Sequence, residues 1–447
     1  MNIERTASTL FVGSFPPREC GIATFTKDIV ESYDAHNGSR SDVVAIDDRS
    51  GCGYVYDSRV IGHIKQAERK SYYAAALMVN RHRCSVVNIQ HEYGLFGGKN
   101  GEWCLDFIGA LKKPVVLTLH TVLPAPSSEH ALMAQRLCES AARVIVLSDT
   151  ARRLLVGSYG IAPSKVTVVH HGVPDVAHRN TASAKKELGL NGRTIVSTFG
   201  LISSSKGLEY AVAAIHEIAQ SRPDVLYLIL GATHPLVRRA EGERYRSSLQ
   251  DRITALGLEG SVRMIGRYLP FDELIAYLQA TDVYVTPYLN PDQVVSGTLA
   301  YALGAGKAIV STPYLYAREL LCDGRGLFAE FRDSRALAKA LERFLSEPAF
   351  RVRTQERAYA FGRRMIWSNV AAKYTSLLAA ASLTSSAHVL KKSAIAPTTS
   401  IASSTSFLPL AKITRQTDTS VRIEGRVGGA ARASGPSRGV SSMKRRI

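Results

Sequence analysis

Short apolar runs recur along the chain, and each is followed by a polar or glycine-containing turn and then by apolar positions at helical spacing. Uninterrupted runs of this kind predict strands buried on both faces, and the helical stretches between them predict right-handed crossovers within parallel sheets. The pattern therefore predicts an α/β protein. The expected strands cover residues 9–12, 86–89, 115–119, 144–147, 166–169, 195–199, 226–230, 283–285 and 308–310.

A polar, charged stretch interrupts this pattern between residue 174 and the strand that starts at residue 195. We expect a linker there, with one short helix. Because 447 residues are too many for one ordinary hydrophobic core, we expect two Rossmann-like domains, at residues 1–178 and 190–362. An amphipathic pattern over residues 363–381 predicts one further helix, which would cross back to the first domain.

Residues 382–447 differ from the rest of the chain in composition. They are rich in Ser, Thr, Ala and Gly, and eleven basic residues against two acidic ones give them a net charge of +9, half of the chain's +18. Such a segment cannot bury enough apolar area to offset the entropy lost on ordering, so we expect a disordered basic tail. Its charge favours peripheral contact with an anionic membrane surface, and a merely solubilising extension is the alternative. Nucleic acid is not an expected partner.

The overall composition narrows the class of protein. No run approaches the roughly 18 to 20 apolar residues that span a bilayer, and the start, MNIERTASTLFVGSF, lacks the apolar segment of a signal peptide, which predicts a cytoplasmic protein. The six cysteines are scattered without a C-x-x-C pair, so we expect reduced core thiols. The adjacent pairs Asp47-Asp48 and His170-His171 do not predict a metal site, because neighbouring residues rarely share one coordination sphere.

The stretch that follows the strand at 283–285 predicts an anion site. Ser296, Gly297 and Thr298 open a helix there, and the unpaired N–H groups and positive dipole of a helix start favour a phosphate. Other nucleotide motifs fit less well. The match to G-x-G-x-x-[GA] at 324–329 precedes a strand instead of following one, and the chain contains no G-x-x-x-x-G-K-[ST] motif.

An ordered set of motifs that includes this stretch resembles the GT-B glycosyltransferases, in particular the retaining group called family 4 or group 1. The resemblance covers roughly residues 8–380. Each motif is weak alone, and their order makes the set specific. The motifs are PRECGIATF at 17–25, TLHT at 118–121, VVHHGV at 168–173, FG at 199–200 with KG at 206–207, and GAGKAIV at 304–310.

The resemblance implies two Rossmann-like domains that face each other across a cleft. It also implies transfer of a hexose, such as mannose or glucose, from a nucleotide-sugar donor held mainly by domain two, with retained anomeric configuration. The acceptor, a carbohydrate or lipid-linked molecule of polysaccharide or glycolipid synthesis, would be held mainly by domain one. No metal ion or other cofactor is expected. Alternatives are a sugar-nucleotide epimerase of the same fold and a catalytically silent binding protein.

Three residues carry the expected chemistry. Lys206 suits the departing diphosphate, with the Gly207 backbone beside it, and Gly21 would let the first-domain loop approach the same group. His120 follows a buried strand, and the resemblance implies that it contacts the donor sugar and helps transfer. A solvated lysine and a hydrogen-bonded core histidine are the alternatives for Lys206 and His120.

Further positions are expected around the cleft. His91 and Glu92 end another strand and should face the acceptor, with structural packing as the alternative. Arg267 would touch the base or the diphosphate, with a solvated surface arginine as the alternative. Family members carry two glutamates eight residues apart, and this chain has Gln293 and Tyr301 there, which leaves open a rebuilt donor pocket or loss of activity. Leu201 likewise stands where an arginine is usual. The expected donor-binding residues are Gly21, Lys206, Gly207, Arg267, Asp292, Gln293, Ser296, Gly297, Thr298 and Tyr301.

Overall fold

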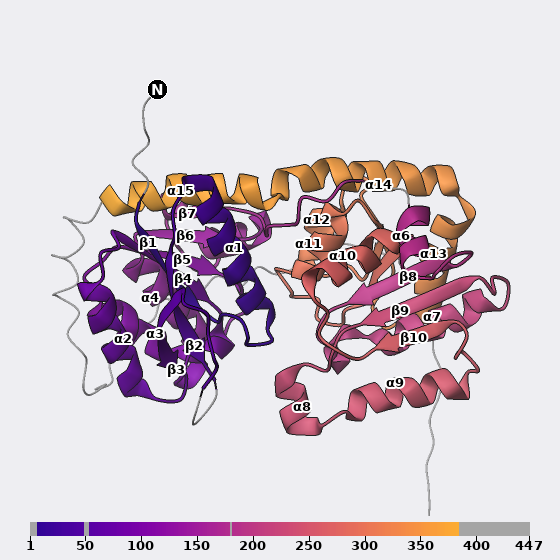
Figure 1. Ribbon diagram of the computed structural model, residues 1–447, viewed down its shortest axis with the longest axis horizontal. Helices are drawn as coiled ribbons and strands as arrows, with labels where there is room; N and C mark the ends of the chain where they lie inside the picture. Colours follow the sequence, from indigo (N-terminus) through magenta and orange to yellow (C-terminus); the bar gives the residue numbers. More distant parts are fainter. Residues whose placement is uncertain (1–6, 49–52, 179–180, 384–447) are drawn as a thin grey trace, which may run out of the picture. The chain divides into compact units, whose positions relative to one another are not determined.

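A computed structural model describes residues 7–48, 53–178 and 181–383, which belong to one compact unit (Figure 1). The basic tail beyond residue 383 lies outside the described residues. Within them, two parallel sheets with helices on their faces form two halves of the unit, which confirms the predicted α/β class.

Seven parallel strands form the N-terminal sheet of the described chain, in the order β3-β2-β1-β4-β5-β6-β7. Along β1, Leu10 and Val12 pack into one apolar cluster and Phe11 into another, so both faces of the strand are buried. The apolar pattern did not predict β2 or β3, and β3 is an edge strand that is only partly buried. The bounds are β1 (Thr9–Gly13), β2 (Asp42–Asp47), β3 (Val60–Lys65), β4 (Val86–His91), β5 (Val115–Leu119), β6 (Arg143–Val146) and β7 (Val166–Val168).

Six further strands of the described chain form the C-terminal sheet, in the order β10-β9-β8-β11-β12-β13, again all parallel. In both sheets the strand order reverses beside the first strand of the half, β1 or β8. Parallel sheets bind ligands at the carboxyl ends of the strands at such a reversal. The bounds are β8 (Thr194–Phe199), β9 (Val225–Leu230), β10 (Val262–Ile265), β11 (Val283–Thr286), β12 (Ala308–Ser311) and β13 (Leu327–Phe328).

Helices connect the strands of the N-terminal sheet, and the first, fourth and fifth of them begin at capping side chains. The Cys20 thiol accepts a hydrogen bond from the Ala23 N–H at 3.3 Å, and Ser148 caps the fifth helix in the same way. The bounds are α1 (Gly21–Asn37), α2 (Arg69–Arg81), α3 (Trp103–Ala110), α4 (Ser128–Ser140) and α5 (Asp149–Gly157), with short 3-10 turns at Tyr93–Leu95, Lys99–Gly101 and Pro163–Lys165.

The first helix of the C-terminal half lies in the segment that we expected to be a linker. Helix α6 packs against α10, and Lys185 of α6 forms an ion pair of 2.6 Å with Asp282, so α6 belongs to the C-terminal half. The bounds are α6 (Thr181–Glu187), α7 (Leu208–Ala219), α8 (Pro235–Glu241), α9 (Arg244–Ala255), α10 (Phe271–Ala280), α11 (Gly297–Gly304), α12 (Leu315–Leu321), α13 (Ser334–Ser346) and α14 (Pro348–Gly362), with a 3-10 turn at Ser204–Lys206.

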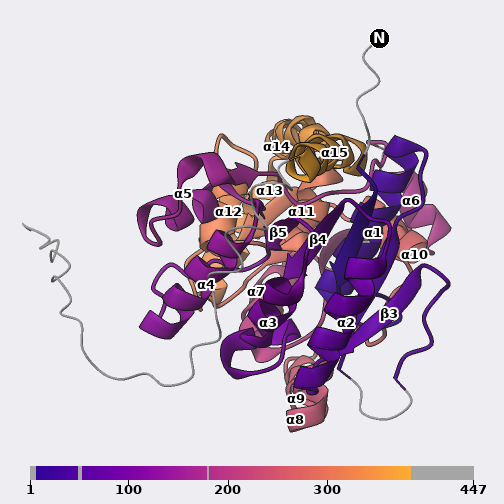
Figure 2. The same ribbon diagram turned by 90° about the vertical axis from the view of Figure 1, so that its left-hand side faces the viewer.

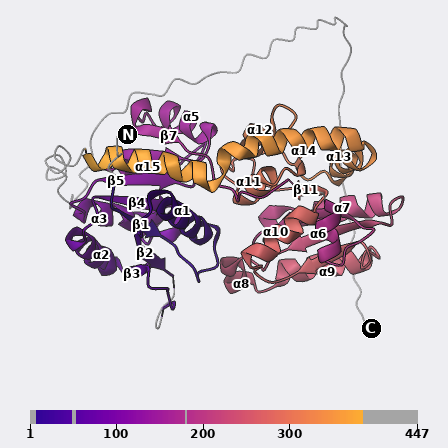
Figure 3. The ribbon, with the colours of Figure 1, turned by 45° about the horizontal axis from the view of Figure 1, so that its top comes forward.

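The last described helix joins the two halves. Helix α14 packs on α11, a 3-10 turn at Arg363–Met365 follows, and α15 (Trp367–Leu383) then packs along α1 of the N-terminal half (Figures 2 and 3). Its Tyr374 is buried and its hydroxyl lies 3.1 Å from the Thr118 hydroxyl of β5.

The cysteines are less uniformly buried than expected. Among the five whose surroundings the structure describes, Cys84, Cys104 and Cys138 are buried, Cys20 is partly exposed and Cys322 is exposed. The expectation of core thiols is therefore wrong for Cys322, which follows the end of α12 and lies at the surface.

Of the helices that the structure describes, none has the length and apolar character needed to cross a membrane.

Candidate active site

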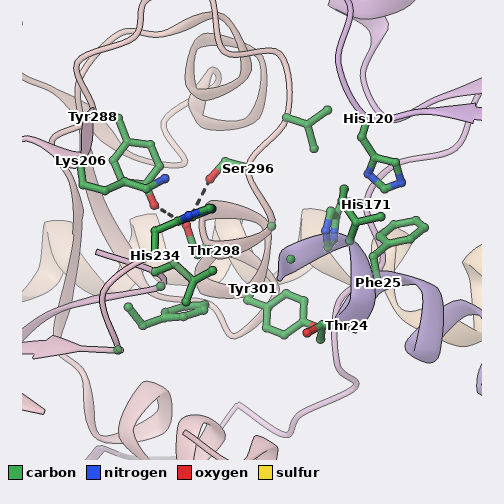
Figure 4. A pocket seen from close by; sticks show the side chains of 18 of the residues that line it. Thr24, Phe25, His120, His171, Lys206, His234, Tyr288, Ser296, Thr298 and Tyr301 are labelled. Carbon is green, nitrogen blue, oxygen red and sulfur yellow. Dashed lines mark hydrogen bonds between the residues drawn. The ribbon is translucent and has the colours of Figure 1, made fainter. Parts of the chain in front are cut away.

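A cavity of about 490 Å³ opens at the carboxyl ends of the strands of both sheets (Figure 4). Its lining residues up to His171 come from the N-terminal half and are called the N-terminal wall; those from Phe199 onward are called the C-terminal wall. A concave site of this size at the strand-order reversal is where a Rossmann-like sheet binds a small ligand.

The start of α11 forms part of the C-terminal wall. The Ser296 hydroxyl caps this helix by accepting a hydrogen bond from the Leu299 N–H at 3.3 Å. The Thr298 hydroxyl lies 2.8 Å from the Tyr288 hydroxyl and 3.2 Å from that of Ser296 (Figure 4). Both hydroxyl side chains line the cavity, so the helix start offers it backbone N–H groups and two hydroxyls.

Lys206 supplies the positive charge of the C-terminal wall. Its Nζ lies 3.9 Å from the centroid of the Tyr288 ring, and no carboxylate among the described residues pairs with it. An unpaired ammonium that lines a cavity is available to an anionic ligand.

Two glycines keep the ends of β8 and β9 close together. Gly200 and Gly231 have φ angles of 134° and 143°, and a Cβ atom on Gly231 would lie 2.0 Å from the Gly200 carbonyl oxygen. Backbone therefore lines the cavity here, beside Leu201, which stands where the resembling family has an arginine.

His120 in the N-terminal wall is held by a chain of buried polar side chains. Its Nε2 donates to Gln90 Oε1 at 2.8 Å, and Gln90 Nε2 donates to Asn88 Oδ1 at 2.6 Å. The ring is 6% exposed and meets Phe25 edge-on at 4.7 Å. Burial, with smaller contributions from His171 and His91, lowers the pKa of His120 to about 3, so the ring is neutral near pH 7.

Glu92 is the one acidic side chain among the described residues that line the cavity. The Thr121 hydroxyl donates to its Oε2, and the Tyr93 N–H donates to its Oε1 at 2.9 Å. Burial raises the pKa of Glu92 above its ordinary value, although both hydrogen bonds oppose the shift.

The cavity brings together most of the residues predicted from the sequence. Nine of them line it: Gly21, Glu92, His120, Lys206, Gln293, Ser296, Gly297, Thr298 and Tyr301. The side chain of Gln293 is fixed by a hydrogen bond from its Nε2 to the Val295 carbonyl oxygen at 2.8 Å.

Four predicted residues do not line the cavity. His91 is buried, stacks on Phe96 at 5.4 Å, and has no hydrogen-bond partner for either ring nitrogen among the described residues. Arg267 pairs instead with Glu273 at 2.5 Å, on the surface. Asp292 is exposed in the loop before α11.

Gly207 has a structural role in place of lining the cavity. Its φ is 61°, and a Cβ atom would lie 2.3 Å from the Pro287 carbonyl oxygen. It therefore lets the Lys206 loop pass close to the end of β11.

Comparison with known proteins agrees with this geometry. The family model of glycosyl transferases group 1 matches residues 180–361, and that of glycosyltransferase family 4 matches residues 21–176. The chain belongs to the group 1 glycosyltransferases. The resemblance found in the sequence is therefore confirmed.

The curated relatives of this group 1 chain are distant. A D-inositol 3-phosphate glycosyltransferase from a Nocardioides species is 26% identical over 60% of this chain and 64% of its own length. A 2-deoxystreptamine glucosyltransferase from Streptomyces kanamyceticus is 28% identical over 47% of this chain and 52% of its own length. The chain thus spans between half and two thirds of these relatives.

Solved structures share the GT-B fold of this chain. Anabaena Alr3699/HepE in complex with UDP and glucose covers 83% of this chain and all of that one, with a TM-score of 0.65 and 16% identity. Sucrose-phosphate synthase from Thermosynechococcus elongatus covers 83% of this chain and 98% of its own, with a TM-score of 0.66 and 16% identity. At these identities the likeness shows the fold alone.

Sequence reasoning missed several side chains of this group 1 site. Tyr301 donates a hydrogen bond to Asp28 of α1 at 2.7 Å, and burial raises the pKa of Asp28 to about 6. Tyr268 and Thr24 make a second bond between the halves, at 2.8 Å. The partners are far apart in the sequence, and no local pattern marks them as a pair.

His171 was noted in the sequence only as half of a pair. Its Nδ1 donates to the Gly172 carbonyl oxygen at 2.7 Å, and burial lowers the pKa of the ring to about 4. A Cβ atom on Gly297 would lie 2.8 Å from His171 Nε2, so the neutral ring sits against the start of α11. The VVHHGV motif was the available signal.

Among the described residues, no group of three or more His, Cys, Asp or Glu side chains could hold a metal ion. Independence from metal ions remains a prediction.

Proposed function

We propose that this chain transfers a hexose from a nucleotide-sugar donor to an acceptor hydroxyl with retention of anomeric configuration. One observation carries the proposal: an unpaired lysine and a helix start face a fixed, neutral histidine across one cavity. The names of the relatives support it, because they describe glycosyl and glucosyl transfer, and one solved neighbour is named as a complex with UDP and glucose.

The C-terminal wall would bind the donor diphosphate. The N–H groups at the start of α11 and the charge of Lys206 would neutralise its oxygens, and their contribution would grow as negative charge accumulates on the leaving group. A cation and a helix start of this kind can do the work of a divalent metal, so activity should survive exhaustive chelation.

The N-terminal wall would position the sugar. His120 is too weakly basic to hold a proton at neutral pH, so its role would be to hydrogen-bond the sugar from a fixed orientation. The bond from the anomeric carbon to the diphosphate would break with its electron pair left on the phosphate oxygen. The acceptor oxygen would bond to that carbon on the same face, and its proton would pass to the departing phosphate.

The uncharged Gln293 and Tyr301 support a donor pocket that differs from that of most relatives. Gln293 is already held by Val295, and the Tyr301 hydroxyl already donates to Asp28, so neither position offers a free carboxylate to the donor. We therefore expect a narrow donor preference, distinct from that of members with the glutamate pair.

The test is a donor screen followed by turnover. UDP-, GDP- and ADP-linked glucose and mannose are screened by thermal shift in EDTA, and each stabilising donor is then incubated with sugar, cyclitol and lipid acceptors. We expect release of the nucleoside diphosphate and an NMR spectrum that shows the donor's anomeric configuration in the product. An inverted product, or interconversion of donors without transfer, would contradict the proposal.

A further inference from the structure

A second cavity, of about 460 Å³, adjoins the first. The two share Gly21, Ile22, Glu92 and His234 in their linings, so a molecule in the second cavity would lie directly beside the donor sugar proposed for the first. An acceptor must present its hydroxyl at that position.

Three arginines line the second cavity, and Asp48 is the one carboxylate among the described residues that pairs with any of them. Arg18 and Arg239 share one carboxylate, that of Asp48, at 3.7 Å and 3.1 Å. Asp48 also accepts a hydrogen bond from the Tyr54 hydroxyl at 2.9 Å. Arg238 has no ion pair or hydrogen-bond partner for its side chain among the described residues.

Arg18 is the most buried of these cations. Its side chain is 9% exposed, its Nη1 donates to the Ile46 carbonyl oxygen at 3.0 Å, and its Nη2 has no acceptor among the described residues. A guanidinium held on one edge and free on the other can bind the oxygens of a second anion.

Three acidic side chains, Asp48, Glu92 and Glu19, line the same cavity, so its formal charges balance and the geometry of the pairs decides. Asp48 is already shared between two arginines, and Glu92 accepts hydrogen bonds from the Thr121 hydroxyl and the Tyr93 N–H and forms no ion pair among the described residues. Glu19 is exposed at the rim. Arg238 and the Nη2 of Arg18 therefore keep N–H groups that no described carboxylate occupies, and these groups can bind an anion.

We propose that the second cavity binds the acceptor and that Arg18, Arg238 and Arg239 recognise a phosphate ester on it. The inference rests on the proposed function, and it names the acceptor class. Of these two cavities, Lys206 lines the first and not the second, and the three arginines line the second and not the first, which would separate the donor diphosphate from the acceptor phosphate.

A phosphate ester can come from a small soluble acceptor or from a phospholipid headgroup. The exposed Leu236, 55% accessible, lies with Pro235 at this cavity and would suit either the edge of a sugar ring or a lipid glycerol. Both sources carry a phosphate monoester or diester, and comparing soluble esters with lipid vesicles separates the two sources.

The primary test measures binding, so that it does not depend on turnover. The full chain is titrated by calorimetry with myo-inositol and myo-inositol 3-phosphate, and with mannose and mannose 6-phosphate, in the presence of the free nucleoside diphosphate. We expect at least one phosphate ester to bind about tenfold or more tightly than its parent alcohol. Arg238→Gln and Arg18→Gln should remove most of that difference.

Two controls give the comparison its meaning. Arg353→Gln changes an exposed arginine of α14 outside both cavities and should keep the full preference for the phosphate ester. Lys206→Ala should weaken nucleoside diphosphate binding while Arg238→Gln changes it less than twofold.

The lipid source is tested by flotation with phosphatidylinositol vesicles against phosphatidylcholine vesicles. Binding to phosphatidylinositol vesicles without binding of any soluble ester assigns the phosphate to a lipid headgroup.

The possible results separate the acceptor-phosphate site from its alternatives. Equal binding of every ester and its parent alcohol, with no preference for phosphatidylinositol vesicles, overturns the inference even if sugar transfer occurs. Loss of nucleoside diphosphate affinity in Arg238→Gln overturns it too, because the arginines would then serve the donor. A phosphate ester that binds in the absence of any turnover would support this site while contradicting the proposed function.

Discussion

The two walls of the cavity differ in what they present to a ligand. The C-terminal wall presents backbone at two glycines and at the start of α11, and Lys206 is the one unpaired cation among its described residues. The N-terminal wall presents the buried His120, which is neutral near pH 7 and fixed through Gln90. Under the proposed function, the positive charge that would meet the diphosphate therefore lies in one wall, and the side chain that would orient the sugar lies in the other.

The backbone of the C-terminal wall should give the largest response to substitution. In Gly231→Ala, a Cβ atom would lie 2.0 Å from the Gly200 carbonyl oxygen at a φ of 143°, so we expect a loss of about 3 kcal/mol or more in the free energy of unfolding. Gly21→Ala in the N-terminal wall is the matched control, because its Cβ atom would meet nothing within 4 Å. Denaturant unfolding measures both, and similar losses would contradict the account.

The charge of the C-terminal wall should give the next largest effect. Lys206→Ala removes the cation that would meet charge developing on the leaving group, so turnover should fall about a hundredfold and donor affinity less. Lys186→Ala, at an exposed position on α6, is the control. Steady-state kinetics with the donor found by screening measures the effect, and equal rates in the two variants would remove Lys206 from the site.

The N-terminal wall should respond in turnover without a change in affinity for the nucleoside diphosphate. His120→Ala removes a proposed contact to the sugar, so we expect turnover to fall about thirtyfold, with diphosphate affinity within twofold of wild type. His91→Leu is the control, because His91 is buried outside the cavity without hydrogen-bond partners in the described chain. A diphosphate affinity that falls in parallel with turnover in His120→Ala would show that the two walls are not separate in function.

The hydrogen bond between Tyr301 and Asp28, which joins the two halves, should give the smallest effect, and the size of that effect depends on pH. Because burial raises the pKa of Asp28 from 3.8 to about 6, the native state holds the proton more tightly than the unfolded chain, and this carboxyl destabilises the fold as pH rises through 6. The shift corresponds to at most about 3 kcal/mol. Asn at this position accepts a weaker hydrogen bond from Tyr301, so we expect a net gain of about 1 kcal/mol.

That gain should appear in Asp28→Asn at pH 8 and vanish near pH 4, where the native carboxyl is already protonated. Thermal unfolding of wild type and variant across this range measures it, with the exposed Asp251→Asn as control. A stabilisation that does not change with pH would show that the burial of a charge at Asp28 is not its cause.

More of the C-terminal wall than of the N-terminal wall could be predicted from the sequence, for a physical reason. A helix start, a glycine turn and the neighbouring lysine are local features, so the pattern around Ser296 and Lys206 was enough to find them. Gln90 and Asp28 act through partners 30 and 273 residues away in the sequence, His120 and Tyr301, and only the packing of β4 against β5 and of α11 near α1 brings them together.

His91 and His120, which both follow buried apolar runs, show how far side-chain direction can be predicted from the sequence of a strand. His91 is the last residue of β4 and packs against Phe96 in the core, whereas His120 lies one residue beyond the end of β5 and lines the cavity. Because successive side chains of a strand alternate between faces, an uncertainty of one residue in the strand end reverses the expected direction. Strand boundaries read from a sequence do not have that precision.

The central claim is that the C-terminal wall binds a nucleoside diphosphate through Lys206 and the start of α11. The most direct measurement is calorimetric titration of UDP, GDP and ADP into wild type, Lys206→Ala and His120→Ala in the presence of EDTA. The account predicts that at least one nucleotide binds wild type, that Lys206→Ala weakens this binding about tenfold, and that His120→Ala leaves it within twofold. Failure of all three nucleotides to bind, or equal affinity in Lys206→Ala and wild type, would contradict the claim.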